Sequence, residues 1–308
     1  TDVEATALKG IVIVQDNLPA TGTRSNGVWA YSTDGSTWVD FPTNYLTIAD
    51  LAKVMYLNAS DFVRFTPNLN VTGALSAPVG RLNFRAVDET YSGNATSGSQ
   101  VNVSNTIQGS GSVSNAGVIS VAVTPVNDAP TLSQSSTLTY TENEAAKAIN
   151  NNITVGDVDN GTFASATVSI TQGLVSSEDL LSFVADVNTM GNIAGSYNAA
   201  TGVMALTSAG NTATLAQWQV ALRSVAYLNS SDAPSTIART VTYVVNDGTA
   251  ASSGLTSTVN VTAVNDAPVV SGGVVSVDED TPYILTSVFK FQYSDPDGHA
   301  QAGVVVTE

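Results

Sequence analysis

The sequence has no cysteine, one histidine and only ten lysines and arginines in 308 residues. Without cysteine there is no disulfide and no thiolate metal site, so stability must come from apolar cores and, we expect, from bound divalent cations. The 26 acidic residues give a net charge of −16, which disfavours nucleic acid as a partner and favours cations. No apolar run approaches the roughly 18 to 20 residues that cross a bilayer, so we expect no membrane span.

Charged residues make up only 12% of the chain, whereas 43% of the residues are apolar. The apolar fraction argues against disorder, and the abundance of Thr, Ser, Asn, Val and Gly is typical of secreted all-β repeat proteins. The first residues, TDVE, have neither the basic nor the apolar region of a signal peptide. We therefore expect a mature or excised piece of an extracellular protein.

A repeat of 138 residues organises the chain. The sequence VNDAP occupies residues 126–130 and again 264–268, and the same shift places Asp157 and Asp159 onto Asp295 and Asp297. Two motifs that keep one spacing indicate a register, not a coincidence.

Each VNDAP follows a run of alternating apolar residues, at 118–123 and 257–262, which predicts the last strand of a domain. VNDAP is therefore the predicted linker. The sequence YLNASD at 56–61 resembles YLNSSD at 227–232, which relates the first domain to the second. About seven short alternating strands per repeat favour a β-sandwich.

Short helices are predicted at 48–55 and 214–224, just before the two YLN motifs. We expect each to cover one end of a sandwich.

Three segments follow from these motifs. Residues 1–125 are predicted to form a sandwich that lacks its opening strands and carries an insertion at 91–117. Residues 126–263 form a complete sandwich. Residues 264–308 supply opening strands of a third repeat, either as part of a longer array or to complete a neighbouring chain.

Acidic residues recur at each junction: the aspartate of VNDAP, the Asp-x-Asp pair 29 residues later, and an aspartate that ends a late strand, Asp88 or Asp247. Clustered carboxylates repel one another unless a cation neutralises them. Because these clusters are built from oxygen ligands, they suit calcium, which takes six to eight oxygens.

The order of these motifs resembles that of cadherin repeats: VNDAP at a junction, then DVD, then NAATG at 198–202 and VVNDG at 244–248. The sequence is most similar to the bacterial cadherin-like tandem repeats of giant RTX-type and biofilm surface adhesins. This resemblance implies tandem cadherin-like or immunoglobulin-like Greek-key β-sandwiches, joined by short linkers that bind Ca²⁺, in an extracellular protein with an adhesive or structural role and no enzyme activity.

The resemblance also implies three sets of calcium ligands, one per junction. The first junction would use the Asn127 carbonyl with Asp128, Asp157, Asp159 and Asp247; the second would use Asn265, Asp266, Asp295 and Asp297, with Glu142 reaching from the second domain; an upstream junction would use Asp2, Glu4 and Asp88. Two departures, Pro125 and Ala263 in place of a further acid and the absence of an Asp-Arg-Glu motif, predict only one or two ions per junction.

Two other signals carry less weight. Residues 32–38 contain Asp-Gly between two strand-like runs, which predicts a hairpin, although an exposed surface of Trp29, Tyr31 and Trp38 could bind sugar. His299 lies beside Asp295 and Asp297, but no serine elbow accompanies it, so catalysis is not expected.

Three functions remain open at this stage. The first is a calcium-stiffened stalk of a bacterial adhesin or biofilm matrix protein, whose partners are neighbouring repeats. The second is a filament subunit in which residues 264–308 complete the next copy of the chain. The third is a module that binds peptides or host or matrix glycans.

Overall fold

The computed structural model describes residues 8–15, 27–42, 54–71, 80–88, 95–101, 113–274, 276–282 and 292–303. The chain divides into two compact units, Thr1–Val126 (unit 1) and Asn127–Glu308 (unit 2). Asp2, Glu4, residues 48–53 of the first predicted helix, and much of the predicted insertion lie outside the described residues. Within the described residues, no helix is long and apolar enough to cross a membrane.

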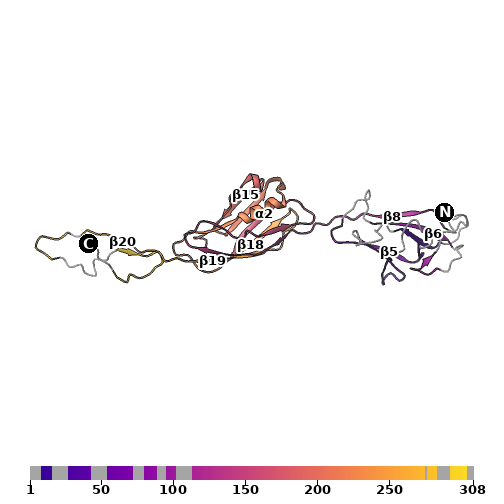
Figure 1. Ribbon diagram of the computed structural model, residues 1–308, viewed down its shortest axis with the longest axis horizontal. Coiled ribbons are helices and arrows are strands. Elements are labelled where there is room, and N and C mark those ends of the chain that lie inside the picture. Colours follow the sequence, from indigo (N-terminus) through magenta and orange to yellow (C-terminus); the bar gives the residue numbers. More distant parts are fainter. Residues whose placement is uncertain are drawn as a thin grey trace. The chain divides into compact units, whose positions relative to one another are not determined.

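The main sheet of unit 2 has six strands in the order β10-β19-β18-β13-β16-β15 (Figure 1). All neighbours are antiparallel except β10 and β19, which run parallel. The strands span Thr137–Thr141 (β10), Ser165–Gln172 (β13), Ile193–Asn198 (β15), Val203–Ser208 (β16), Arg239–Asn246 (β18) and Leu255–Thr262 (β19). The strand predicted at 257–262 is confirmed as the end of β19.

A second sheet of three strands forms the other layer of unit 2. Its order is β11 (Lys147–Ala148), β17 (Ala226–Asn229) and β14 (Asp179–Ser182). Tyr140 of β10 meets Tyr227 of β17 edge to face, with ring centroids 5.2 Å apart. Both tyrosines are fully buried, so this contact joins the two layers of the sandwich across one core.

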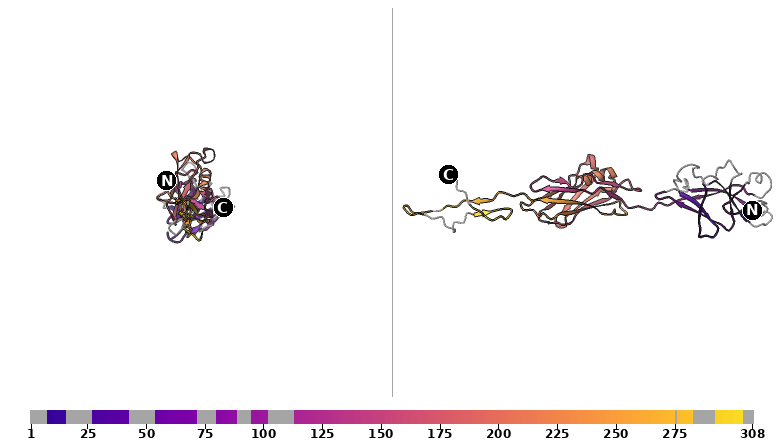
Figure 2. Two further views of the ribbon diagram at one scale, coloured as in Figure 1. Left: turned by 90° about the vertical axis from the view of Figure 1, so that its left-hand side faces the viewer. Right: turned by 60° about the horizontal axis from the view of Figure 1, so that its bottom comes forward.

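The helix α2 (Leu215–Ser224) lies beside the sheets, and the prediction at 214–224 is confirmed (Figure 2). Thr214 and Gln217 form a capping box at its start, which explains why the helix begins there. Trp218 is fully buried and donates its indole N–H to the Phe163 carbonyl over 3.1 Å, so the helix is anchored to the core. The shorter elements of unit 2 are β9 (Thr131–Ser133), β12 (Thr154–Gly156), α1 (Val187–Met190), the 3-10 turn η1 (Ala209–Asn211), β20 (Val269–Ser271) and β21 (Gln292–Ser294).

Unit 1 contains one sheet in the order β7-β4-β1-β6-β8 and a second in the order β3-β2-β5. Its two small cores lie around Tyr56 and around Trp29. The strands span Leu8–Gln15 (β1), Gly27–Ser32 (β2), Val39–Asp40 (β3), Val54–Asn58 (β4), Phe62–Pro67 (β5), Gly80–Asp88 (β6), Gln100–Val101 (β7) and Gly117–Val121 (β8). The fold is therefore all-β in both units, as predicted.

One end of the first predicted helix is wrong. Val54 and Met55 belong to β4, where both side chains are fully buried. The run from Val54 to Leu57 is apolar throughout, and such a short run fits a buried strand as well as a helix.

The predicted hairpin at 32–38 is confirmed, because β2 and β3 pair antiparallel with Tyr31 opposite Val39. The sugar-binding surface is not supported. Trp29 is only 3% exposed and packs against Phe65, its cross-strand partner in β5, at 5.1 Å. Trp38 is covered in part by Arg64, whose guanidinium carbon lies 4.2 Å from the ring centroid.

The turn after β13 requires glycine. Gly173 has φ +72°, and a Cβ there would lie 2.4 Å from the Ala238 carbonyl oxygen. Gly173→Ala should therefore lower the free energy of unfolding of unit 2 by about 1–3 kcal/mol in urea titrations. Gly161→Ala, where nothing lies within 4 Å of the new Cβ, is the control. Equal stability of the two variants would contradict this account of the turn.

Candidate metal centres

Five predicted residues gather at the end of unit 2 where its first linker enters, and we name them the first cluster: Asn127, Asp128, Asp157, Asp159 and Asp247. Asp157 and Asp159 lie in the turn after β12, and Asp247 follows β18. The backbone N–H of Asp128 donates to Asp159 Oδ2 over 2.7 Å, and the Asn127 amide donates to Asp247 Oδ2 over 2.9 Å. The linker is thus hydrogen-bonded both to the turn that contains Asp159 and to the loop that contains Asp247.

Asp157 organises the Asp-x-Asp turn. Its Oδ1 accepts the backbone N–H groups of Asp159 and Asn160, over 2.8 and 2.7 Å. Its Oδ2 is buried and has no hydrogen-bond partner. A buried carboxylate oxygen without a donor is costly unless a cation or water contacts it, so this atom is a candidate ligand.

Asp247 is held as an anion by its own turn. Its Oδ1 accepts the N–H groups of Thr249 and Ala250, over 2.6 and 2.7 Å. Burial acts to raise the pKa of Asp247, but these bonds and the one from Asn127 outweigh it, so the pKa lies below its usual value. The carboxylate is therefore charged at neutral pH.

Asn160 contacts the first cluster, although the sequence did not predict it as a ligand. Its amide donates to Asn127 Oδ1 over 2.9 Å and also lies 3.4 Å from Asp247 Oδ2. The corresponding position in the next repeat is Gly298, so the repeat gave no signal there. Only its place directly after the Asp-x-Asp pair could have suggested it.

The second cluster consists of Glu142, Asn265, Asp266, Asp295 and Asp297, and it repeats the bonds of the first. Asp266 N–H donates to Asp297 Oδ2 over 2.7 Å, and Asp297 N–H donates to Asp295 Oδ1 over 3.0 Å. Asn265 donates to the Asp266 carbonyl over 3.1 Å, as Asn127 does to Asp128 over 2.9 Å. The two linkers are therefore built alike.

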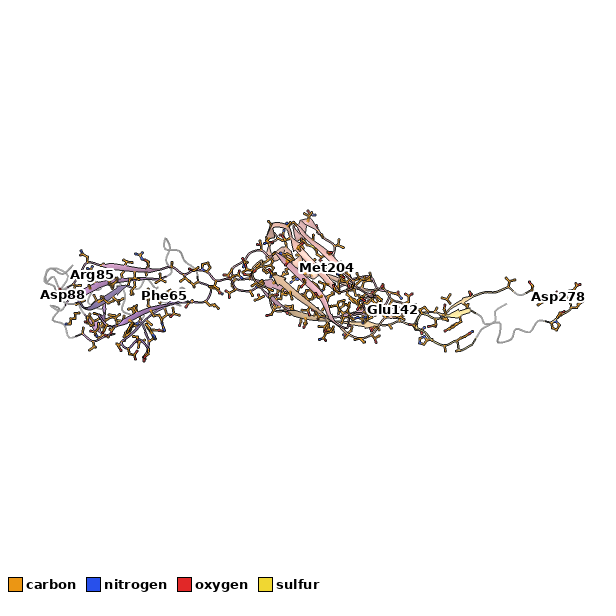
Figure 3. All side chains as sticks on the ribbon, turned by 180° about the vertical axis from the view of Figure 1, so that it is seen from behind. Phe65, Arg85, Asp88, Glu142, Met204 and Asp278 are labelled. Carbon is orange, nitrogen blue, oxygen red and sulfur yellow. The ribbon has the colours of Figure 1, made fainter. Side chains whose placement is uncertain are left out.

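Glu142 comes from the sandwich itself, at the end opposite Asp247. It follows β10, whose last residue, Thr141, pairs with Thr262 at the end of β19. Figure 3 shows Glu142 where the segment beginning at Val264 leaves the sandwich. Glu142 is 3% exposed, and its Oε2 accepts the Val264 N–H over 2.8 Å.

Two oxygens of the second cluster are buried without a partner, Glu142 Oε1 and Asp266 Oδ2. Ligand atoms of Glu142, Asp266 and Asp297 lie within 4.8 Å of one another, and so do those of Asp295, Asp297 and His299. Among the described residues, these are the two groups of three with that spacing. Asp297 is common to both.

The first cluster does not form such a group. Asp159 Oδ2 and Asp247 Oδ2 are turned toward the linker, where Asp128 and Asn127 donate to them.

Of the predicted upstream set, only Asp88 is among the described residues. Asp2 and Glu4 lie outside the described residues. Asp88 ends β6, which runs antiparallel to β8 with Gly80 opposite Val121. Asp88 therefore lies at the end of unit 1 away from the outgoing linker, as Figure 3 shows.

The donor sets fit calcium. In both linker clusters the side chains offer carboxylate and amide oxygens, which are the ligands of hard cations. Each cluster also has at least one buried carboxylate oxygen that no protein donor contacts and that is free to bind a cation. These oxygens belong to Asp157 in the first cluster and to Glu142 and Asp266 in the second.

The sequence matches no family model and has no significant match among curated protein sequences. Among solved structures, the ectodomain of human desmocollin-1 is similar at a TM-score of 0.24 and 12% identity. The match covers 62% of this chain and 29% of that ectodomain, so the chain spans less than a third of that protein's length. This likeness is too distant to assign the chain to a family.

Proposed function

We propose that the chain is a segment of an extracellular repeat protein with a structural or adhesive role, in which calcium ions stiffen the junctions between β-sandwiches. A stalk of a large bacterial adhesin or biofilm matrix protein is the setting that the VNDAP resemblance implies. The observation that carries the proposal is the linker bond made twice, from Asp128 N–H to Asp159 and from Asp266 N–H to Asp297.

These bonds place several carboxylates beside a short linker. Without a cation the carboxylates repel one another, and a short tether between small interfaces allows neighbouring domains to move. A calcium ion held by Glu142, Asp266 and Asp297 would bind the end of the sandwich to the linker and to the turn that follows.

Small-angle scattering with and without chelator tests this function. With calcium, the maximum dimension of the particle should rise, and the scattering profile should indicate a less flexible chain. Circular dichroism must show that the strands persist in both states. The variant Asp128→Asn/Asp266→Asn should respond less. Dimensions that do not change on calcium removal would count against a stiffened stalk.

Glu142→Gln should weaken calcium binding at the second cluster, because it removes the charge of a buried ligand. We expect a loss of affinity of roughly tenfold or more by isothermal titration calorimetry. Glu144→Gln is the matched control: Glu144 lies in the same turn but pairs with Lys147 at 2.5 Å, outside the cluster. Similar losses in both variants would mean that Glu142 is not a ligand.

A second candidate function is self-assembly by strand addition. The strand β8 corresponds to β19 by the 138-residue shift, yet among the described residues it pairs with β6 alone, whereas β19 also pairs with β10. Val118 and Ile119 of β8 are 49% and 46% exposed. An open edge of this kind accepts an extended segment.

The matching donor would be the segment before the turn at Asp280. By the 138-residue shift β10 corresponds to residues 275–279, which include Val277, and a residue with φ +64° follows shortly after each segment, Asn143 and Asp280. Val274 and Val277 are 97% and 54% exposed and so are available to a second copy. Deleting residues 264–308 should abolish concentration-dependent polymers in analytical ultracentrifugation, and polymers that survive the deletion would refute this candidate.

A further inference from the structure

The second cluster contains a histidine that the first cluster lacks. His299 is the only histidine of the sequence, and its position in the repeat is occupied by Gly161 next to the first cluster. Its side chain is 62% exposed, whereas the Asp295 and Asp297 side chains beside it are 5% and 12% exposed. An exposed imidazole therefore stands at the rim of a buried pair of carboxylates.

The turn itself fixes this arrangement. Asp295 Oδ1 accepts the backbone N–H groups of Asp297 and His299, and Gly298 closes the turn with φ +78°. The Tyr293 hydroxyl lies 2.9 Å from the His299 carbonyl oxygen and 3.1 Å from Asp295 Oδ2, and its one proton is shared between these two acceptors. The backbone of residue 299 is thus tied to the aspartate that lies next to its ring.

The imidazole faces the carboxylates without a hydrogen bond of normal length. His299 Nδ1 lies 3.4 Å from Asp295 Oδ1 and 4.0 Å from Asp297 Oδ2, beyond the usual 2.7–3.2 Å range. In a tetrahedral zinc site with bonds of about 2.0–2.1 Å, neighbouring ligand atoms lie about 3.3–3.4 Å apart. The separation of His299 Nδ1 from Asp295 Oδ1 matches this value, whereas its separation from Asp297 Oδ2 exceeds it by about 0.6 Å.

Asp297 connects this group to the carboxylates of Glu142 and Asp266, where the unpartnered oxygens lie. The two groups differ in chemistry. Three carboxylates suit a hard cation such as calcium, whereas imidazole with carboxylates suits zinc and other borderline divalent metals.

We propose that the second junction holds two cation positions that share Asp297: a calcium position on Glu142, Asp266 and Asp297, and a position for a divalent transition metal on Asp295, Asp297 and His299. This inference deepens the proposed function, since it adds a second class of ion to one of its junctions. The first junction, with Gly161 in place of the histidine, has the hard-cation chemistry alone.

The experiment uses the whole chain, freed of metal, with zinc and calcium titrated separately and zinc titrated again in saturating calcium. Zinc should bind in calcium with a stoichiometry near one, and the single pair of imidazole signals in NMR spectra should shift. His299→Ala should lose zinc affinity by at least the roughly 10–100-fold that even an outer-shell change costs, with calcium affinity kept. Gly161→His, where the space is open, should gain zinc binding at the first cluster.

Zinc binding that is unchanged in His299→Ala, or imidazole signals that do not move, would overturn the proposal, as would full displacement of zinc by calcium. The calcium titration separates this result from the proposed function. A chain that binds zinc through His299 but takes no calcium would refute the calcium junction and leave the zinc position standing.

Discussion

Asp179→Ala should lower the free energy of unfolding of unit 2 by about 3–5 kcal/mol, because it removes one of the two carboxylates that pair with a buried guanidinium and leaves the Nε–H without its acceptor. Asp179 and Arg239 are both fully buried, and Arg239 Nε lies 3.1 Å from Asp179 Oδ1. Asp179 also accepts the Tyr227 hydroxyl over 2.5 Å and the Val175 N–H over 2.7 Å. Urea unfolding followed by tryptophan fluorescence, including that of buried Trp218, measures the loss.

The rest of the network explains why the loss should be large. Arg239 Nη2 donates to Glu178 over 2.7 Å and lies 3.0 Å from Asp179 Oδ1, and Nη1 donates to the carbonyls of Ser235 and Ile237, so every nitrogen of the guanidinium is engaged. Burial and the bond to Asp179 raise the pKa of Tyr227, which keeps its hydroxyl a donor. These groups fix the loop before β18 to the start of β14.

Two further variants keep this prediction testable if Asp179→Ala fails to fold. Asp232→Ala, at an exposed position of the same motif region, should change stability by less than about 0.5 kcal/mol. Asp179→Leu/Arg239→Met should recover part of the loss, because it removes the two fully buried charges and leaves only Glu178 without its ion-pair partner. A loss below about 1 kcal/mol in Asp179→Ala would mean that the network contributes little.

Calcium should reverse the sign of the stability change that Asp297→Asn causes. At a free concentration 100 times its dissociation constant, one bound ion stabilises the folded state by roughly 2.7 kcal/mol, so chelation should lower the stability of unit 2 by about that amount per site. In chelator, Asp297→Asn should be neutral or stabilising, because it removes repulsion from Glu142 and Asp266. In calcium it should be destabilising.

Scanning calorimetry of the wild type and of Asp297→Asn, each with calcium and with chelator, measures this change of sign. Asp186→Asn is a control, because Asp186 caps α1 far along the chain from either cluster and should respond equally in both conditions. If Asp297→Asn is destabilising by the same amount with and without calcium, Asp297 acts through its hydrogen bond to Asp266 and not through an ion.

The repeat allowed much of the clusters to be foreseen, because the same turn chemistry recurs at a fixed spacing. An Asp-x-Asp turn whose first carboxylate accepts two backbone N–H groups needs little tertiary context, so Asp157 and Asp295 could be placed together with their linkers from sequence alone. Asn160 could not, since its contacts with Asn127 and Asp247 depend on how three loops meet.

Pairing between strands was harder to foresee. The YLN motif forms β4 in unit 1 and β17 in unit 2, but β4 pairs with β1 in the main sheet, whereas β17 lies in the second layer between β11 and β14. A strand's alternation tells which residues share a face, not which neighbour it has. For the same reason, the sequence could not decide whether Trp29 faces solvent or the core.

The most direct test of the account is a crystal structure of the chain grown in calcium, with the ions identified by anomalous scattering. We expect calcium at about 2.3–2.6 Å from Glu142 Oε1 and Asp266 Oδ2 and from Asp157 Oδ2, the three buried carboxylate oxygens of the described residues that have no protein partner. Water alone against these oxygens at saturating calcium would contradict it.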